Sequence, residues 1–484
     1  MSRVAVIGGG VGGLSVAIRL ASDGHRVTLV ERNDHLGGKL TTYVRSGFTF
    51  DVGPSLVTLP HLLDETFRAA GTTLDDEVEM VRLDPQFAYR WRDGSVLVKP
   101  DDAEATADSF DTFVPGAGDR WREFDAHGAR IWSVAERTFF AGPMTSPAEL
   151  AQRMESRDDL TAIDPLRTLW SASRSFFDDL HLQQWVGRYA TYSGSSPLKA
   201  PATLSCIPHV ESAYGCWYPM GGLGALRDAF VAVAERAGVE LVTGVGVDRI
   251  TSTPDRVTGL GLADGTYVDA EIVISDADAD HLYRDLFPDD DALRSVRRAP
   301  RSTSGFSLCL GVRDITPDIT HHNVWFSDDH LQEFREIDAG QMPSDPTIYG
   351  CVSSVTDPTQ APEGDENWFL LINTPPGARF DENTMRDLVL DRLARRGVDL
   401  RRRLRFSATL TPTDIERRDG TPGGSIYGTS SDGAMAAFAR PANRGPKAGL
   451  YLVGGSTHPG GGLPLVSIGA RIVADLVTAD TGAS

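Results

Sequence analysis

Cysteine is scarce in this chain, which has four cysteines among its 484 residues. No two of them are spaced closely enough to form a metal-binding CxxC pair, so we predict reduced thiols in a cytosolic protein. The adjacent His321 and His322 have no third ligand at a useful spacing, and we therefore expect a structural role for both and no metal site. The four cysteines are Cys206, Cys216, Cys309 and Cys351.

Positive charge is also in short supply. The chain has 47 Lys and Arg against 67 Asp and Glu, which gives a formal net charge of −20 and a pI of about 5.0. A nucleic-acid partner requires a basic face, so this balance excludes that class of function. The arginine-rich segment 391–405 is interpreted as the solvated end of a helix, with lipid headgroup binding as the alternative.

Long uninterrupted apolar segments are missing as well. The segment 448–470 is free of Asp, Glu, Lys and Arg, but two prolines and a glycine cluster interrupt it, which excludes a continuous membrane helix. We expect no secretion signal, because a structured motif begins by Val4. A soluble or peripherally attached protein is therefore predicted.

The first thirty residues predict a strand, a glycine turn, a helix and a second strand. "RVAVIGGG" is rich in β-forming residues, helical spacing of apolar residues follows up to Gly24, and "RVTLVE" is the second strand. Such a βαβ unit implies a parallel sheet. Because the chain is long enough for two or three domains and contains no repeat or low-complexity linker, we expect interleaved domains.

The glycine turn has the spacing of a dinucleotide-binding motif. Gly8, Gly10 and Gly13 follow the pattern GxGxxG directly after a strand and before a helix. Glycines at these positions allow the backbone to approach a pyrophosphate, whose charge faces the helix N-terminus. Glu31 ends the second strand, where a carboxylate can accept hydrogen bonds from a ribose. A purely structural glycine turn is the less favoured alternative.

Two further motifs lie within the next 25 residues. Gly37-Gly38-Lys39 comes shortly after Glu31, and Asp51-Val52-Gly53-Pro54-Ser55 follows it. This arrangement resembles the FAD-binding amine-oxidase-like flavoproteins. The resemblance implies that FAD is the cofactor, that the glycine pair runs along its phosphates, and that the stretch ending at Ser55 lies near the flavin ring.

Motifs along nearly the whole chain narrow the resemblance. "RYATYSGSSPLKAPATLSCIPHVESAYGCWYPMGGLGAL", "HHNVWFSDD", "FARPANRGP" and "GLYLVGGSTHPGGGLPLV" resemble the bacterial carotenoid (phytoene) desaturases. The resemblance implies an FAD-dependent desaturase of a carotenoid or related isoprenoid, with hydride transfer from a substrate C–H bond to flavin N5. Within that family, "GGSTHPGGGLPLV" is more similar to enzymes that act on an already modified carotenoid end.

The glycine-rich segment near the C-terminus should pack against the flavin. A strand over 450–453 leads into Gly454-Gly455, and Pro464 starts an apolar helix. In the resembling flavoproteins this helix points its N-terminus at the pyrimidine end of the flavin, where unpaired N–H groups stabilise the reduced form. Many relatives place an acidic residue after the strand's glycine. This chain has Gly455-Ser456, so we expect no acidic contact with the ribityl chain.

The predicted fold is therefore α/β. We expect a Rossmann-like FAD-binding domain, built from 1–75, 216–290 and 440–484, interleaved with a mixed α+β substrate domain built from 76–215 and 291–439. The predicted cofactor-binding residues are Gly8, Gly10, Val11, Gly12, Gly13, Glu31, Arg32, Gly37, Gly38, Lys39, Gly53, Pro54, Ser55, Val247, Gly454, Gly455, Gly462, Leu463 and Pro464.

Catalytic residues are marked less clearly, because a hydrocarbon has no group to ionise. One carbon would lose a hydride to the flavin and its neighbour a proton to a base. The family-like segments offer Arg188, Tyr192 and His209, of which the first two would share a helix face; packing or surface roles are the alternatives. His458 could position the substrate or tune flavin protonation, or it could be a loop histidine bonded to the backbone.

Other functions stay open, since fold and cofactor do not fix the substrate. One is a flavin oxidase or desaturase of a polar secondary metabolite, and another is a carotenoid isomerase. A third, which is not an enzyme, is a prenyl-protein escort; the complete dinucleotide motif argues against it. The oligomeric state, the electron acceptor and the exact substrate are not predicted.

An apolar substrate would be taken up from the bilayer. We therefore expect a cytoplasmic protein attached peripherally to the inner face of the cell membrane through an exposed apolar patch. Residues 130–185 are predicted to form this patch, with a helical core as the alternative. Its aromatic members are Trp132, Phe139, Phe140, Trp170, Phe176 and Phe177.

Overall fold

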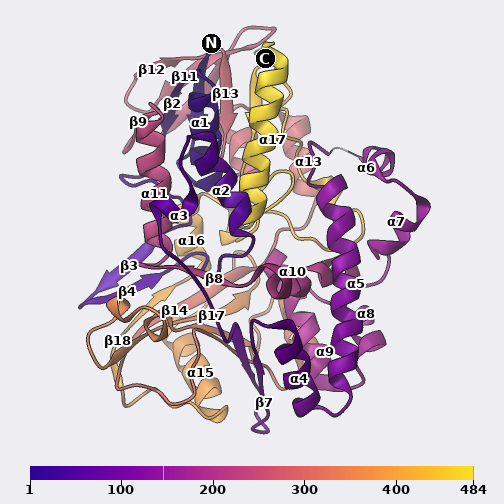
Figure 1. Ribbon diagram of the computed structural model, residues 1–484. Coiled ribbons are helices and arrows are strands. Elements are labelled where there is room, and N and C mark those ends of the chain that lie inside the picture. Colours follow the sequence, from indigo (N-terminus) through magenta and orange to yellow (C-terminus); the bar gives the residue numbers. More distant parts are fainter. Residues whose placement is uncertain (145, 483–484) are drawn as a thin grey trace.

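A five-stranded parallel sheet forms one part of the computed structural model, which describes residues 1–144 and 146–482 (Figure 1). The strand order is β19-β13-β1-β2-β9, and every neighbouring pair is parallel. The parallel sheet and its helices confirm the predicted α/β class. The strands are β1 (Arg3–Ile7), β2 (Arg26–Val30), β9 (Glu240–Val242), β13 (Ile272–Ser275) and β19 (Leu450–Leu452).

Helices cover one face of this sheet and a small sheet covers the other. Leu14 and Ile18 of α1 (Val11–Ser22) are fully buried, as the helical spacing predicts. The C-terminal helix α17 (Leu463–Thr481) runs beside α1, and both chain termini lie at the same end of the molecule (Figure 1). The other covering elements are α2 (Pro60–Ala69), α3 (Leu74–Glu77), α11 (Leu223–Arg236), and the antiparallel β10 (Val247–Ser252), β11 (Val257–Leu262) and β12 (Tyr267–Asp269).

A seven-stranded mixed sheet forms the second part. Its order is β18-β14-β17-β16-β15-β6-β7, antiparallel except where β15 pairs with β6. The helix α15 (Glu382–Arg395) packs on one face, and Phe48 and Phe50 of a hairpin pack on the other. The elements are β3 (Thr42–Arg45) and β4 (Phe48–Asp51) of the hairpin, β6 (Phe87–Arg90), β7 (Val96–Lys99), β14 (Ser304–Arg313), β15 (His322–Trp325), β16 (Ile348–Cys351), β17 (Asp365–Thr374) and β18 (Leu404–Leu410).

The chain crosses between the two parts several times. Strands of the parallel sheet come from three segments of the chain, and those of the mixed sheet come from 87–99 and 304–410. The hairpin β3–β4 lies within the segment predicted for cofactor binding, yet it packs on the mixed sheet. Connecting elements are β5 (Met80–Arg82), β8 (Trp217–Pro219), α12 (Ala279–His281), α13 (Asp290–Arg298), α14 (His330–Asp338) and α16 (Pro412–Asp419).

A helical layer flanks the mixed sheet, on the right in Figure 1. A short 3₁₀ helix, η1 (Arg188–Ser193), continues from α9 (Leu180–Gly187) into the interior of the molecule. The helices are α4 (Ala103–Phe113), α5 (Ala117–Thr138), α6 (Pro147–Arg153), α7 (Arg157–Ala162), α8 (Leu169–Phe176), α9 (Leu180–Gly187) and α10 (Cys206–Tyr214).

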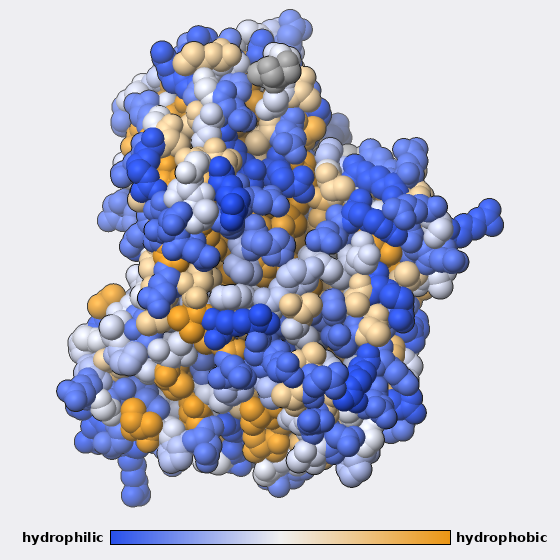
Figure 2. Space-filling view, in the orientation of Figure 1, coloured by the Kyte–Doolittle hydropathy of each residue, from blue (hydrophilic) through white to orange (hydrophobic). Residues whose placement is uncertain are grey.

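The aromatic residues of this layer do not form the predicted exposed patch. Trp132 and Phe177 are buried, and the other four predicted members are partly buried, because they pack between helices and against the mixed sheet. The exposed apolar side chains of the same layer are Leu160, Leu166 and Leu180, exposed to 55%, 88% and 68%. Hydrophilic side chains dominate the face shown in Figure 2. Within the described residues, no helix is both long and apolar enough to span a bilayer.

Candidate active site

One cavity of about 510 Å³ joins the two parts of the molecule. Gly10, Glu31 and Gly38 line it at the C-terminal edge of the parallel sheet, and Phe87 and Tyr349 line it at the mixed sheet. In parallel α/β sheets this edge is where ligands bind. The cavity therefore connects a nucleotide-type site with a chamber of different chemistry.

The first glycine turn leaves its helix N-terminus open toward the cavity. Gly10 precedes α1 and offers no side-chain cap, so the N–H groups of Val11 and Gly12 are available to a ligand, whereas that of Gly13 donates to Asp276. A Cβ atom on Gly10 or Gly12 would lie 2.5 Å or 2.8 Å from the carboxylate of Asp276. Only glycine fits at these two positions, and the resulting concavity suits a phosphate group.

The carboxylate of Glu31 is held firmly at the end of β2. It accepts hydrogen bonds from the backbone N–H of Gly9 at 2.8 Å and from the backbone and side-chain N–H groups of Asn33 at 2.8 Å and 2.7 Å. Glu31 is buried but lines the cavity. A carboxylate has about four acceptor positions, so Glu31 retains capacity for one ribose hydroxyl.

The second glycine motif lies directly against the first. The N–H of Gly37 donates to the carbonyl of Gly9 at 2.7 Å. The ammonium group of Lys39 donates to the carbonyl of Ile426 at 2.5 Å, and the hydroxyl of Ser55 lies 2.7 Å from that of Tyr349. This motif and the following one, which ends at Ser55, thus tie the nucleotide-type end of the cavity to its other walls.

The C-terminal glycine segment completes the nucleotide-type end. β19 ends at Leu452, and α17 begins at Leu463 with Pro464 in its first turn and no side-chain cap on Gly462. The open N-terminus of α17 therefore lies at the cavity wall. A Cβ atom on Gly461 would first meet Tyr427, at 3.1 Å, so Tyr427 belongs to this wall as well.

The predicted cofactor-binding residues are brought together here. All of them line the cavity except Gly13 and Gly454, which lie behind the wall against Asp276. Two of the predicted catalytic residues, Arg188 and Tyr192, line the chamber, whereas His209 and His458 do not line the cavity.

Arg188 organises the chamber as a cation surrounded by aromatic rings. Its guanidinium carbon lies 4.8 Å from the ring centre of Phe87 and 5.2 Å from that of Tyr192. Three more rings lie within 6 Å, at distances typical of cation–π contacts; they belong to Tyr89, Tyr189 and Tyr349.

The charge of Arg188 is balanced through phenol groups. Its guanidinium donates to the Tyr192 hydroxyl at 3.3 Å, and the hydroxyls of Tyr189 and Tyr192 donate to the fully buried carboxylate of Glu211. Burial disfavours the charged form of Arg188, but the three tyrosines and Glu211 outweigh burial and hold its pKa above the ordinary value. Arg188 is therefore a permanent cation that fixes the chamber walls.

The two remaining candidates have other contacts. His209 lies 3.2 Å from both carboxylate oxygens of Asp125, between α5 and α10. The Nε2 atom of His458 lies 3.2 Å from the Gly142 carbonyl, and burial lowers the pKa of His458 to about 4, so its imidazole is neutral. The contact of His458 agrees with the alternative of a loop histidine bonded to the backbone.

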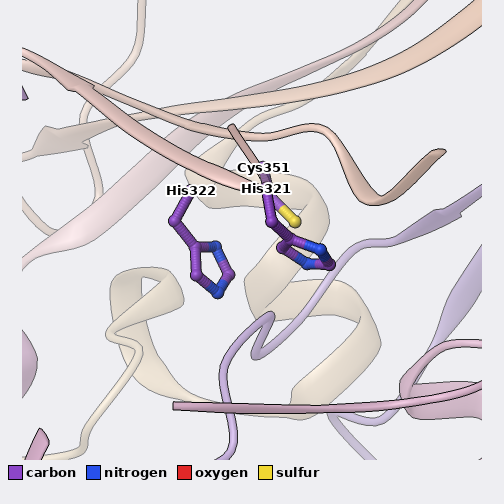
Figure 3. Close-up of side chains that lie close together, drawn as sticks. All are labelled: His321, His322 and Cys351. Carbon is purple, nitrogen blue, oxygen red and sulfur yellow. The ribbon is translucent and has the colours of Figure 1, made fainter. Parts of the chain in front are cut away.

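The structure brings Cys351 to the pair His321 and His322 (Figure 3). The pairing of β15 with β16 places His322 opposite Cys351, which no spacing in the sequence reveals. The ligand atoms of the three buried residues lie within 4.8 Å of one another. The Nδ1 atom of His321 already lies 2.8 Å from the Thr356 hydroxyl, and the Nδ1 atom of His322 lies 2.8 Å from the Tyr349 hydroxyl. Burial lowers the pKa of His321 to about 3, so it packs as a neutral ring.

Asp276 is a site residue that the sequence analysis missed. It follows β13, accepts a hydrogen bond from the Gly13 N–H at 3.0 Å, and lines the cavity beside the first glycine turn. Burial raises the pKa of Asp276 to about 7, and the charge of Glu31 adds to the shift, while the Gly13 N–H and Lys39 oppose it. Its place directly after a central strand of the parallel sheet was the available signal.

Comparison with known proteins places this arrangement in a family. The family model described as flavin containing amine oxidoreductase matches residues 11–477. A 4,4′-diapolycopene oxygenase of a Methylomonas species is 34% identical over 488 residues, which cover 99% of this chain and 98% of that protein. A 4,4′-diaponeurosporene oxygenase of Staphylococcus haemolyticus is 32% identical over 487 residues, covering 99% of this chain and 97% of the relative. Putrescine oxidase bound to putrescine has a TM-score of 0.68 at 14% identity, covering 100% of this chain and 99% of that one.

The carboxyl of Asp276 should make stability depend on pH. Its pKa is about 7 in the folded protein against 3.8 ordinarily, so the folded state loses stability as pH rises from 3.8 through 7. Asp276→Asn removes this loss. The unfolding free energy of the variant minus that of the original protein should therefore increase by about 2 kcal/mol when the pH is raised from about 5.5 to about 8.5. Urea unfolding of the apoproteins measures it, and a gain that does not change with pH would contradict the assignment.

Proposed function

This chain belongs to the flavin-containing amine oxidoreductase family and is an FAD-dependent oxidoreductase, and we propose that it oxygenates an acyclic carotenoid. The expectation of FAD as cofactor is confirmed by the family. The observation that supports the proposed substrate is that one continuous cavity runs from the nucleotide-type end into an aromatic chamber.

The residues at the nucleotide-type end fit FAD. The open turn at Gly10 would hold the pyrophosphate, Glu31 would hold the adenosine ribose, and the N-terminus of α17 would face the flavin. Bound FAD supplies an acceptor for a hydride or for electrons removed from a C–H bond. The chain itself contributes binding, orientation and the exclusion of water.

The chamber suits a conjugated hydrocarbon. Phe87, Tyr349 and Phe369 line it, and the exposed faces of such rings can stack on a polyene. Arg188 holds these walls in place and acts as a positioning residue. A polar secondary metabolite would find fewer partners here, because the hydroxyls of Tyr189 and Tyr192 are already bonded to Glu211 and that of Tyr349 to Ser55.

Oxygenation is favoured over the desaturation that the sequence motifs imply. Two curated relatives that match this chain over almost its whole length are named as oxygenases of acyclic carotenoids. Desaturation is the second candidate, supported by the motifs of the phytoene desaturase family; it would transfer two hydrogen atoms to FAD, whereas oxygenation also requires dioxygen as the source of the added oxygen.

The mass of the product distinguishes these reactions. FAD-loaded protein should convert 4,4′-diaponeurosporene, dispersed in detergent under air, to a product that has gained oxygen, as liquid chromatography with mass detection would show. FAD-free protein is the control and should give no product. A product that has only lost two hydrogen atoms would establish desaturation instead, and a product of unchanged mass would indicate isomerisation.

Replacement of Arg188 tests the chamber. Lysine keeps the charge but lacks the planar group that contacts five rings, so Arg188→Lys should reduce turnover of the carotenoid about tenfold while FAD occupancy stays unchanged. Arg396→Lys is the matched control, because Arg396 is equally buried, pairs with Asp345 at 2.8 Å and lies outside the chamber. Equal turnover in both variants would remove Arg188 from the substrate site.

We further propose that the protein works at the inner face of the cell membrane, where an apolar substrate is available. The exposed leucines of the helical layer, and not its aromatic residues, are the proposed contact. The double variant Leu166→Asp, Leu180→Asp should lower the fraction that floats with neutral-lipid liposomes at least twofold. Ile315→Asp, a change at an exposed position outside the helical layer, should not. If the unmodified protein, the double variant and Ile315→Asp float to the same extent, the proposed contact is refuted.

A further inference from the structure

The cavity extends past the start of β16, beyond the aromatic chamber. Tyr349 lies in β16 and Thr347 directly precedes this strand; the two are two residues apart, about 7 Å along an extended chain, and both line the cavity. Tyr349 contacts Ser55 at the flavin side, whereas Thr347 contacts Glu333 of α14. The end of the cavity at α14 is therefore the end farther from the proposed flavin position.

This far end contains a buried carboxylate in a fixed position. Glu333 is 2% exposed and accepts hydrogen bonds from the Thr347 backbone at 2.9 Å, the Thr347 hydroxyl at 2.7 Å and the Ser327 hydroxyl at 2.9 Å. These donors leave part of its acceptor capacity unused. Glu333 also borders a second cavity of about 280 Å³, which is lined mainly by charged residues.

An imidazole without a hydrogen-bond partner lies beside this carboxylate. His330 is 3% exposed, and neither of its ring nitrogens has a hydrogen-bond partner among the residues that the structure describes. Its Nδ1 atom is 3.7 Å from Glu333, too far for a hydrogen bond. A Cβ atom on Gly187 would lie 2.9 Å from Nε2, so glycine there leaves room for the ring.

An unpaired polar group inside a protein is costly, and a hydrocarbon could not relieve this cost. We propose that His330 and Glu333 bind an oxygen atom at the far end of the polyene, so that the preferred ligand is an acyclic carotenoid with one hydroxylated or aldehyde end. The inference rests on the proposed function and refines its substrate class. The imidazole donates to either group, and Glu333 accepts from a hydroxyl only.

This arrangement orients the ligand. The oxygen-bearing end occupies the polar site at α14, the conjugated chain lies along the aromatic walls, and the unmodified end points toward FAD. A reaction that oxidises a terminal carbon must then supply this ligand, and the chemistry at FAD acts on its other end.

Binding of three polyenes tests the proposal. FAD-loaded protein is titrated with 4,4′-diapolycopene, its terminal alcohol and its terminal aldehyde, and quenching of tryptophan fluorescence gives the dissociation constants. We expect the alcohol to bind about tenfold more tightly than the hydrocarbon, with the aldehyde between them. His330→Phe should abolish both preferences while leaving the affinity for the hydrocarbon within about twofold.

His127→Phe is the matched control. His127 is also buried beside a carboxylate, with Nε2 at 3.4 Å from Asp164, but it lies outside the cavity. This variant should keep the original order of affinities. Equal binding of all three polyenes by the unmodified protein would overturn this inference alone, as would an unchanged order in His330→Phe. A protein that binds none of them overturns the proposed function together with it.

Discussion

Close contact between three turns of the backbone is the constraint on which the cofactor site depends. The turn after β1, the Gly37-Gly38 segment and the segment after β19 touch one another without intervening side chains: Gly37 donates to the Gly9 carbonyl, and a Cβ atom on Gly12 would lie 3.3 Å from Gly454. The segment after β19 is more than 400 residues from the other two, yet the three enclose one concave surface. The parallel sheet aligns them, because β1, β2 and β19 all end at the same edge.

Buried charge divides the cavity into regions with different tasks. At the nucleotide-type end, Glu31 and Asp276 provide carboxyl groups next to open helix N-termini. In the chamber, Arg188 is a charged group at the wall, and Glu211 balances it from behind through two phenols. An apolar chain can therefore pass along the aromatic rings without desolvating a free charge. Rigidity follows from the same network, since moving Arg188 would leave Glu211 buried and unpaired.

The sequence predicts the parts of the site that depend on local backbone geometry. Glycine spacing, the strand ending at Glu31 and the strand-to-helix segment around Gly462 are local patterns, and the structure places nearly all of those residues on the cavity wall. Contacts between distant segments were not predictable in this way. Asp276, Tyr427 and the pairing of His322 with Cys351 depend on strand order and register. The prediction of a surface patch in 130–185 rests on the need of an apolar substrate for an exposed entry site, and the sequence does not show which neighbours cover these aromatic side chains.

The position of polar groups within an apolar cavity carries more information about the substrate than its volume does. Aromatic walls accept many flat or extended hydrocarbons, and the fold itself serves amine oxidases as well. Discrimination requires groups whose hydrogen bonds are satisfied by one ligand and left unsatisfied by another, since an unpaired buried donor is costly. Arg188, Tyr189, Tyr192 and Glu211 are bonded to one another and so contribute shape alone. Among the described residues, His330 and Thr421 are buried lining side chains with polar atoms that have no hydrogen-bond partner, and only His330 has two such atoms and a carboxylate beside it, so we place the selectivity of the cavity at its far end.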